Sequence, residues 1–145
     1  MKYYLDVYSP RGWEDSKEHG LLFSGFPENR WKAVQRINEN DILICYMKDK
    51  SVWFAAFEVM SKPYWSDKPR VYTEKVCPCR VDIRKLVVVE PEKAIPTKSL
   101  LSRLKLFAHL KNPANWGPPL RTSPRPLYED DGKLILEELN KRSLG

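Results

Sequence analysis

The sequence is poor in the residues on which many enzyme and metal sites depend. Its 145 residues include six glycines, three cysteines and two histidines. It contains no glycine-rich phosphate loop, no G-x-S-x-G nucleophile motif and no H-E-x-x-H zinc motif. We therefore expect a protein that is not an enzyme and that uses no cofactor and no metal.

The few cysteines do not form a metal or redox motif. Cys77 and Cys79 are separated only by Pro78, one residue fewer than in the C-x-x-C motif, and no second cysteine pair follows. Residues two apart on a strand face the same side, so we interpret this pair as small side chains packed on one face of a sheet. With Cys45 the chain has three cysteines, an odd number, and a reducing compartment would keep all three as thiols.

Long hydrophobic runs are absent as well. No stretch of about 18 apolar residues occurs, and residues 1–6 lack the apolar segment of a signal peptide. We accordingly expect a cytoplasmic protein with no membrane partner. The chain also has no low-complexity tract and no internal repeat, and its length is typical of one domain, so we expect a single domain over residues 1–145.

Basic residues outnumber acidic ones in this chain. There are 25 Lys and Arg against 19 Asp and Glu, which gives a formal net charge of +6 and a pI of about 9.2. A basic surface attracts polyanions when its charge is gathered on one face, whereas a dispersed excess is a solvated surface without a partner. Composition is compatible with both interpretations.

Alternation and helix-start signals predict the order of the secondary-structure elements. Residues 3–8 alternate as a strand, and Ser9 with Pro10 begins a helix that Gly20 ends. Two β-rich segments around the polar residues 48–51 predict a hairpin. The other predictions are a link over 21–25, a helix over 27–37, hairpin strands over 42–47 and 52–60, a long strand over 76–89, a short helix over 99–104, a loop over 111–127 and a last helix over 130–141. Strands in the middle with helices around them favour an α+β fold, a small and partly closed barrel wrapped by helices.

Aromatic residues make up 12% of the chain, and two tryptophans lie where no periodic pattern requires them. Trp65 and Trp116 belong to polar, proline-containing loops. The basic residues near them are Lys62, Lys68 and Arg70 for Trp65, and Lys111, Arg121 and Arg125 for Trp116. Loop aromatics beside cations suit base stacking, which is worth about 1–3 kcal/mol per base, with Arg and Lys on the phosphates. For each single aromatic, packing in the core is the alternative interpretation.

Several segments, taken in order, resemble a known family. They are Tyr3-Tyr4-Leu5-Asp6-Val7, Phe23-Ser24-Gly25-Phe26 with Arg30-Trp31, Asp41-Ile42-Leu43-Ile44-Cys45-Tyr46, Trp53 to Val59, Asn112-Pro113-Ala114-Asn115-Trp116-Gly117, and Leu120-Arg121-Thr122-Ser123-Pro124-Arg125. Together they extend over almost the whole chain. In this order and spacing the sequence resembles the EVE domain family of the PUA-like superfamily, which is related in fold to the YTH readers of methylated RNA.

The resemblance implies a PUA-like mixed β pseudobarrel with peripheral helices, no catalysis, and a pocket for a single modified base in RNA or DNA. The residues that match the base pocket of the related readers are Phe23, Ser24, Tyr64, Trp65 and Leu120. Trp31 and Trp116 are additional candidates for the pocket, and the candidates for phosphate contact are Lys111, Arg121 and Arg125. The chain differs from the methyl-RNA readers at Phe23, where they have tryptophan.

Two binding hypotheses follow from these residues. The first is a nucleic-acid-binding module, with RNA preferred to DNA, in which Trp65 and Phe23 sandwich a flipped base and Ser24 hydrogen-bonds its edge. The second is a sensor that takes a free nucleoside, a nucleotide or another small molecule into the same pocket.

A third hypothesis, an enzyme acting on a nucleotide, would need Asp6, His19 or Cys45 at the pocket. The loop over 111–127 also has two interpretations, a clamp for the ligand or an interface with a protein partner.

Overall fold

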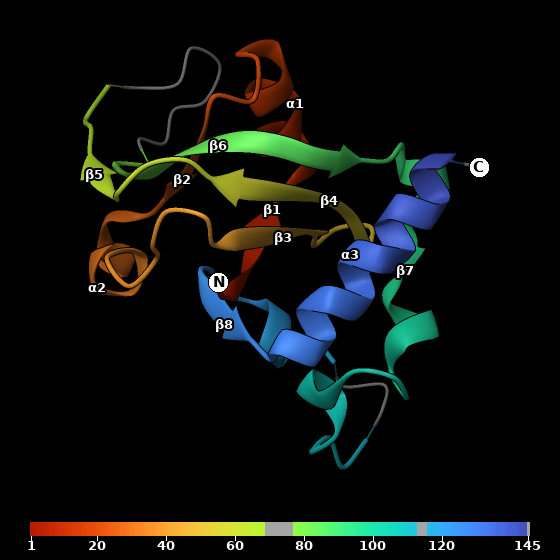
Figure 1. The fold of residues 1–145 in the computed structure, drawn as a ribbon. Helices are drawn as coiled ribbons and strands as arrows, with labels where there is room; N and C mark the ends of the chain where they lie inside the picture. The colour runs from red at the N-terminus through yellow and green to blue at the C-terminus, as the bar shows by residue number, and fades with distance from the viewer. Residues whose placement is uncertain (69–76, 113–115, 145) are drawn as a thin grey trace.

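The structure, a computed structural model, describes residues 1–68, 77–112 and 116–144. Its strands form one mixed sheet (Figure 1). The strands are β1 (Tyr3–Tyr8), β2 (Phe23–Phe26), β3 (Ile42–Met47), β4 (Val52–Val59), β5 (Tyr64–Trp65), β6 (Cys79–Val88), β7 (Ile95–Pro96) and β8 (Arg125–Leu127). The main path through the sheet is β2-β6-β4-β3-β1-β8, with β5 paired to β6 and β7 paired to β4.

Helices surround this sheet. The α-helices in the described ranges are α1 (Pro10–Glu18), α2 (Trp31–Val34) and α3 (Glu129–Leu144). The shorter 3-10 helices are η1 (Glu28–Arg30), η2 (Pro91–Lys93), η3 (Thr97–Leu100), η4 (Lys105–Phe107) and η5 (Pro118–Leu120). In Figure 1, α3 runs diagonally past the right-hand ends of the central strands, whereas α1 lies at the top and α2 at the left.

The curled mixed sheet with helices at its periphery is an α+β, PUA-like pseudobarrel, as the sequence predicts. Strand β1 pairs in parallel with β3 on one side and antiparallel with β8 on the other. Parallel neighbours need a crossover connection, and the segment between β1 and β3 carries α1, β2 and α2. Strand β1 is buried along almost its whole length. It is therefore an interior strand with packed layers on both faces.

Several local predictions are confirmed. Ser9 caps α1, because its Oγ accepts a hydrogen bond of 3.0 Å from the Gly12 N–H, and Pro10 is the first helical residue. Gly20, just after that helix, has a φ of +78°. Strands β3 and β4 pair antiparallel around the turn at 48–51.

Two predictions between β1 and β3 are wrong. The segment 21–25 was expected to be a link, but its last three residues belong to β2, because their backbone pairs with β6. The helix expected over 27–37 is a 3-10 turn followed by the four-residue α2. Its end tightens through i to i−3 bonds, from Arg36 N to Ala33 O and from Ile37 N to Val34 O, which bury Ile37 without a longer helix.

The later part of the chain also differs from expectation in places. The segment 99–104 is a 3-10 helix and a turn instead of an α-helix, although Leu100 and Leu104 are buried as predicted. A single turn buries its leucines in either conformation, so the pattern alone does not separate the two. Strand β6 begins at Cys79, and Val76 lies outside the described residues. The expected loop over 111–127 contains η5 and ends in β8, and residues 113–115 are likewise outside the described ranges.

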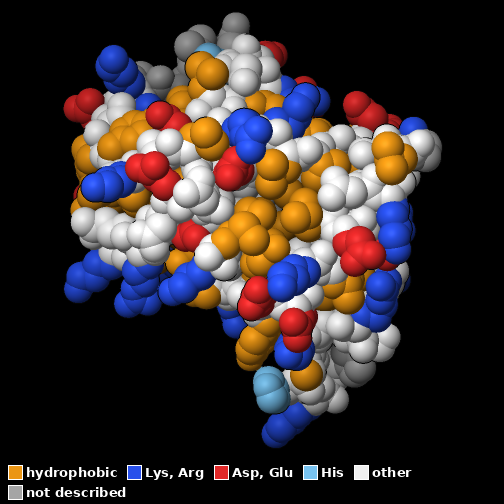
Figure 2. All heavy atoms as spheres, viewed as in Figure 1, with side chains coloured by type: hydrophobic (Ala, Val, Ile, Leu, Met, Phe, Trp, Pro, Cys, Tyr) orange, Lys and Arg blue, Asp and Glu red, His pale blue; other side chains and the backbone are white. Residues whose placement is uncertain are grey.

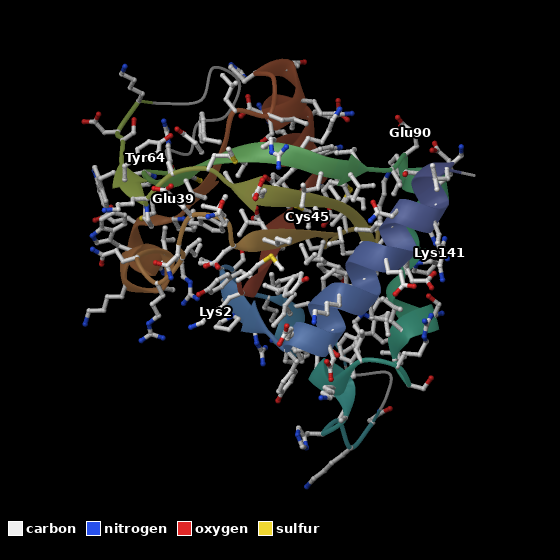
Figure 3. The ribbon with its side chains drawn as sticks, viewed as in Figure 1. Lys2, Glu39, Cys45, Tyr64, Glu90 and Lys141 are labelled. Carbon is white, nitrogen blue, oxygen red and sulfur yellow. The ribbon has the colours of Figure 1, made fainter. Side chains whose placement is uncertain are left out.

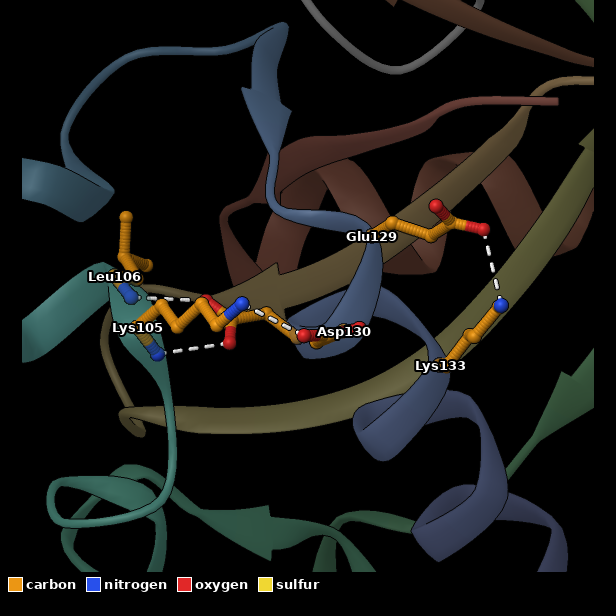
Figure 4. A network of polar contacts seen from close by, with 6 residues as sticks. Lys105, Leu106, Glu129, Asp130 and Lys133 are labelled. Atoms are coloured by element: carbon orange, nitrogen blue, oxygen red, sulfur yellow. Dashed lines mark hydrogen bonds and ion pairs between the residues drawn. The ribbon is translucent and has the colours of Figure 1, made fainter.

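Helix α3 is fastened to the sheet at its first turns. The Asp131 carboxylate accepts hydrogen bonds of 2.8 and 2.9 Å from the backbone N–H groups of Lys105 and Leu106 (Figure 4). The next residue, Gly132, lies directly against the ring of Tyr3 on β1: a Cβ at Gly132 would be 2.2 Å from Tyr3 Cγ. This close approach requires glycine, so it fixes the position of α3 over β1.

The surface on the α3 side carries mixed charge. In Figure 2 Lys and Arg side chains are interspersed with Asp and Glu, and hydrophobic side chains lie between them. The positive excess is therefore not gathered on this face. Among the described residues, no helix is both long enough and apolar enough to cross a membrane.

The contact between Gly132 and Tyr3 predicts a stability change. Gly132→Ala should lower the free energy of unfolding by about 1–3 kcal/mol, because the added methyl group overlaps the Tyr3 ring. The control is Gly117→Ala, since a Cβ there meets no atom within 4 Å and the residue has a φ of −59°. Denaturant unfolding followed by circular dichroism measures both. Equal stability of the two variants would contradict the close packing of α3.

Candidate functional site

A pocket of about 670 Å³ opens where β1 ends and α1 begins. Its other walls include Gly25 and Phe26 of β2, the turn η1 and the segment 121–123. Ligand pockets in proteins commonly measure roughly 300–1,000 Å³, so this cavity is large enough for a small organic molecule.

The buried residues Asp6 and Tyr8 form the floor of the pocket. Together with Ser24, which does not itself line the pocket, they make a buried polar cluster, called the Asp6 cluster below. Side chains alternate along β1, so Asp6 and Tyr8 face the pocket while Tyr3 faces α3. The Ser24 hydroxyl, on β2, donates a short hydrogen bond to the Asp6 carboxylate, and its oxygen lies 3.1 Å from Tyr8 Oη. Asp6 is 2% exposed. Because a buried carboxylate needs hydrogen-bond donors, this cluster places a stabilised acceptor at the base of the cavity.

Cationic side chains line the pocket above this floor: Arg11, Arg30, Lys48 and Arg121. Asp6 is the one acidic residue among the described lining residues. Arg30 is held in place by the carbonyls of segment 123–124, to which Nε and Nη2 donate over 3.2 and 2.7 Å. Arg121 and Lys48 are exposed, and their side chains have no hydrogen bond or ion pair with any described residue. The rim is thus positively charged, and part of that charge is available to an anion.

Phe23, expected to stack on a base, stacks on an arginine. The Arg80 Cζ lies 4.4 Å from the centroid of the Phe23 ring. Arg80 is buried and donates to Cys77 O over 3.0 Å, to Ser66 Oγ over 3.1 Å and to the Lys68 carbonyl. A base could stack on this face of the Phe23 ring only if the Arg80 guanidinium moved away. Ser24, the other residue predicted from the same segment, is buried and acts through the Asp6 cluster.

The neighbouring residues Tyr64 and Trp65 point to opposite sides of β5. Tyr64, at the left of Figure 3, donates a 2.6 Å hydrogen bond to Asp82 Oδ1. Burial, and next this hydrogen bond, raise the pKa of Tyr64 to about 12. Trp65 is 49% exposed, and its ring meets the Trp31 ring edge-on, with centroids 5.7 Å apart and an interplanar angle of 86°. Trp65 therefore offers a ring surface to a ligand, whereas the Tyr64 hydroxyl is already bonded.

The pair of Trp31 and Trp65, called the tryptophan pair below, does not line the pocket, but residues close to each of them do. Trp31 directly follows Arg30, which lines the cavity. Trp65 pairs with Cys79 on β6, and Cys77, two residues earlier, is also a lining residue. The sequence-based alternatives for Trp31 were core and pocket; the structure packs it partly buried against the core, and it is not among the described lining residues of the pocket.

Of all the predicted site residues, Arg121 is the one found among the described residues that line the cavity. Leu120 is buried in the core and does not line the pocket. Trp116 packs partly buried against the core. Arg125 donates a hydrogen bond of 2.8 Å to Pro119 O, and Lys111 is exposed away from the pocket lining. Of the three residues predicted to contact phosphate, the structure brings Arg121 to the cavity.

Sequence reasoning missed most of the walls supplied by β1 and α1. Asp6 was considered only as a group for an enzyme, and Ser9 only as a helix cap, yet both line the pocket. A charged residue inside an otherwise apolar strand was the available signal, because buried charge in a strand needs a partner. Nothing in the sequence indicated that Lys48, in a hairpin turn, reaches the same cavity.

Of the three residues named for an enzyme, Asp6 lines the pocket, whereas His19 and Cys45 are not among its described lining residues. Cys45, labelled in Figure 3, is the partner of Asp6 on β3 and is fully buried. Burial, and then the charge of Asp6, raise the pKa of its thiol well above the usual value. His19 ends α1, with Nδ1 2.8 Å from Asp15 O. No group of three or more His, Cys, Asp or Glu residues suited to a metal ion occurs in the described part of the chain.

Comparison with known proteins identifies structures with a similar fold. No family model matches the chain, and no curated protein matches its sequence. Solved structures do match. The YTH domain-containing protein Mmi1 in complex with RNA has a TM-score of 0.68 at 10% identity, covering 96% of this chain and 81% of that one. The Pho92 YTH domain in complex with m6A has a TM-score of 0.68 at 12% identity, covering 96% and 83%. A hypothetical protein from Leishmania major has a TM-score of 0.65 at 14% identity, covering 98% and 96%. The chain therefore has a YTH-like fold.

The pocket wall contains a native chemical probe. Cys77 is half-buried and lines the cavity, whereas Cys45 and Cys79 are buried with raised thiol pKa values. We expect a maleimide at neutral pH to label Cys77 first, because the thiolate must be both formed and accessible to react. Mass spectrometry of the labelled peptides measures the order, and Cys77→Ser should remove the fast phase. Faster labelling of Cys45 would contradict the burial of β3.

Proposed function

We propose that this protein is a non-catalytic nucleic-acid-binding module that takes one nucleotide of a single strand, RNA in preference to DNA, into the pocket above the Asp6 cluster. One observation carries the proposal: a cavity of about 670 Å³ combines a cationic rim with a buried hydrogen-bonding floor. A nucleotide is complementary to both features, because it has an anionic phosphate at one end and a hydrogen-bonding base at the other.

The rim is suited to the phosphate backbone. Arg121 and Lys48 are exposed cations on the cavity, and Arg30 is already oriented by its bonds to segment 123–124. Lys and Arg contacts to phosphate supply affinity that does not depend on sequence and that weakens with salt. The rim would thus hold the strand while the base enters.

The tryptophan pair is suited to a base outside the cavity. Trp65 has a half-exposed ring whose position is supported by Trp31. Stacking of a base on an exposed aromatic ring is tolerant of sequence and contributes about 1–3 kcal/mol per base. In this arrangement Trp65 stacks a neighbouring nucleotide, since Arg80 covers Phe23.

The structural neighbours support the choice of ligand. Mmi1 was solved with RNA and the Pho92 domain with m6A, and both share this chain's fold. Binding of RNA by this protein, and a modified base as the preferred occupant of its pocket, are the extension that we propose.

Salt dependence tests the rim. Short single-stranded RNA oligomers should bind with an affinity that falls as salt rises, and Arg121→Ala should reduce the slope of log K against log salt by about 0.7, one phosphate contact. The matched control is Arg103→Ala, which makes the same charge change beside α3, where Arg103 pairs with Glu138 over 3.6 Å. Fluorescence anisotropy at several salt concentrations gives both slopes.

The outcomes of this titration separate the hypotheses. Equal losses in the Arg121 and Arg103 variants would show that only net charge matters, which contradicts a phosphate site at the rim. Binding of a free nucleotide that is insensitive to salt, without binding of oligomers, would favour the sensor. Protection of Cys77 from maleimide by bound RNA would place the ligand in the cavity.

Removal of the exposed tryptophan ring tests the stacking surface. Trp65→Ala should weaken RNA binding about tenfold and remove most of the tryptophan quenching on binding, because the stacked ring is lost. Met60→Ala, at another exposed apolar residue, is the control and should leave the affinity unchanged. An unaltered Kd for the Trp65 variant would exclude stacking on this residue.

A further inference from the structure

We infer that the rim of the pocket holds a phosphate monoester, so that the nucleotide taken into the cavity carries a terminal phosphate and is not an internal link of the strand. This inference rests on the proposed function, because it concerns the same pocket. It adds the chemical class of the anion that the rim selects.

Segments far apart in the sequence meet where β1 passes into α1. The Val7 N–H donates to Ser123 Oγ over 3.1 Å, which holds this serine against β1. The Lys48 N–H donates to Tyr8 O over 3.1 Å, so the hairpin turn begins beside the residue that precedes Ser9. Ser9, Lys48 and Ser123 all line the cavity. These three residues therefore stand at one part of its wall.

The two serine hydroxyls at this part of the wall remain donors. Ser9 Oγ accepts a bond of 3.0 Å from the Gly12 N–H, and Ser123 Oγ accepts the bond from Val7. A hydroxyl has one hydrogen to donate in addition to its acceptor positions. Neither of these two hydrogens has an acceptor among the described residues. Each serine is thus fixed in place by a backbone N–H and has its own hydrogen left for a ligand.

Two cations of the rim add positive charge to these donors. Lys48 and Arg121 are exposed, line the cavity, and have no side-chain hydrogen bond or ion pair with any described residue. Arg30, by contrast, already donates through Nε and Nη2 to two backbone carbonyls. The rim therefore combines two uncommitted positive charges with two hydroxyl donors, a set that is complementary to an anion with several acceptor oxygens.

A phosphate monoester matches this set better than a phosphodiester does. At pH 7 the monoester carries a charge of about −1.5 to −2 and three strong acceptor oxygens, whereas each internal link of a strand carries a single negative charge. Hydrogen bonds to an ionised phosphate are about twice as strong as those between neutral groups. The extra charge and the extra oxygen of a monoester let both uncommitted cations and both hydroxyls bind the same group.

Oligomers that differ only at their ends test this assignment on the wild-type protein. Pentamers of adenosine, cytidine and uridine are titrated by calorimetry in three forms: with a 5′-phosphate, with a 3′-phosphate, and with hydroxyls at both ends. We expect one of the two phosphates to raise the affinity about tenfold over the hydroxyl form, the effect of one added charge-assisted bond. A methyl ester of that phosphate should lose most of the gain, because it has the charge and the oxygens of an internal link.

Two lysines of one turn assign the effect to the rim. Lys48→Gln removes one uncommitted cation, so the affinity ratio between phosphorylated and hydroxyl pentamers should fall to about threefold, the non-additivity expected of direct partners. The control variant, Lys50→Gln, makes the same charge change two residues later, at an exposed position that is not among the described lining residues, and should keep the full ratio.

A second pair of variants tests the hydroxyl of Ser9. Asp and Asn are both good N-cap residues, so Ser9→Asp and Ser9→Asn each keep an acceptor for the Gly12 N–H. The Asn amide can still donate to a phosphate, whereas the Asp carboxylate only accepts and repels it. The affinity ratio should therefore be lower in Ser9→Asp than in Ser9→Asn. Since both side chains cap α1, a difference between the two variants does not come from the loss of the cap.

The failures can be told apart. If pentamers bind equally well with and without a terminal phosphate, or the methyl ester binds as well as the monoester, the monoester assignment is overturned while the proposed function stands. Equal ratios in the Lys48 and Lys50 variants would overturn the assignment to this rim. If mononucleotides of the same bases bind while pentamers do not, the monoester assignment holds and the sensor replaces the proposed function. If neither binds, both are wrong.

Discussion

The hydrogen bond from Ser24 to Asp6 joins two strands that are far apart in the sheet. Strand β2 is the first and β1 the last but one in the strand order, with β6, β4 and β3 between them. Their side chains meet only because the sheet curls back on itself. The Ser24 hydroxyl is a donor that helps to offset the cost of burying the Asp6 carboxylate. The bond that joins β1 and β2 across the curled sheet therefore also holds a carboxylate that lines the pocket.

The distribution of charge differs between the α3 face and the pocket. The α3 face mixes both signs, and its ion pairs are exposed, as for Lys105 with Asp130 at 2.7 Å and Lys133 with Glu129 at 3.0 Å. Exposed pairs of this kind contribute little to stability. At the pocket, by contrast, the described lining residues include four cations and one buried carboxylate. A modest net charge thus produces a local positive rim where the cavity opens.

The architecture was largely predictable from sequence, and the pocket was not. Periodicity and capping in residues 3–20 and the hairpin at 48–51 depend on neighbouring residues, so local patterns identify them. Strand β2 was missed because four residues paired to β6 have no period long enough to detect. The pocket depends on which distant segments meet. The aromatic Trp65 and the basic Arg121 could be recognised in the sequence. The role of Asp6, however, depends on its bond with Ser24, 18 residues away. In the same way, the position of Arg80 over the Phe23 ring depends on contacts between distant segments.

The cavity is assembled from segments that are far apart in the sequence and are therefore synthesised at different times. The Val7 N–H donates to Ser123 Oγ over 3.1 Å, across 116 residues of chain, and segments 6–12 and 121–123 face each other over the opening. Segment 6–12 is therefore synthesised long before segment 121–123. Such non-local pairing slows folding, and an interior strand stays unpaired until its partner strand has been synthesised. A nascent chain that has not yet reached Ser123 lacks one wall of the cavity, so the pocket forms only after segment 121–123 has been made.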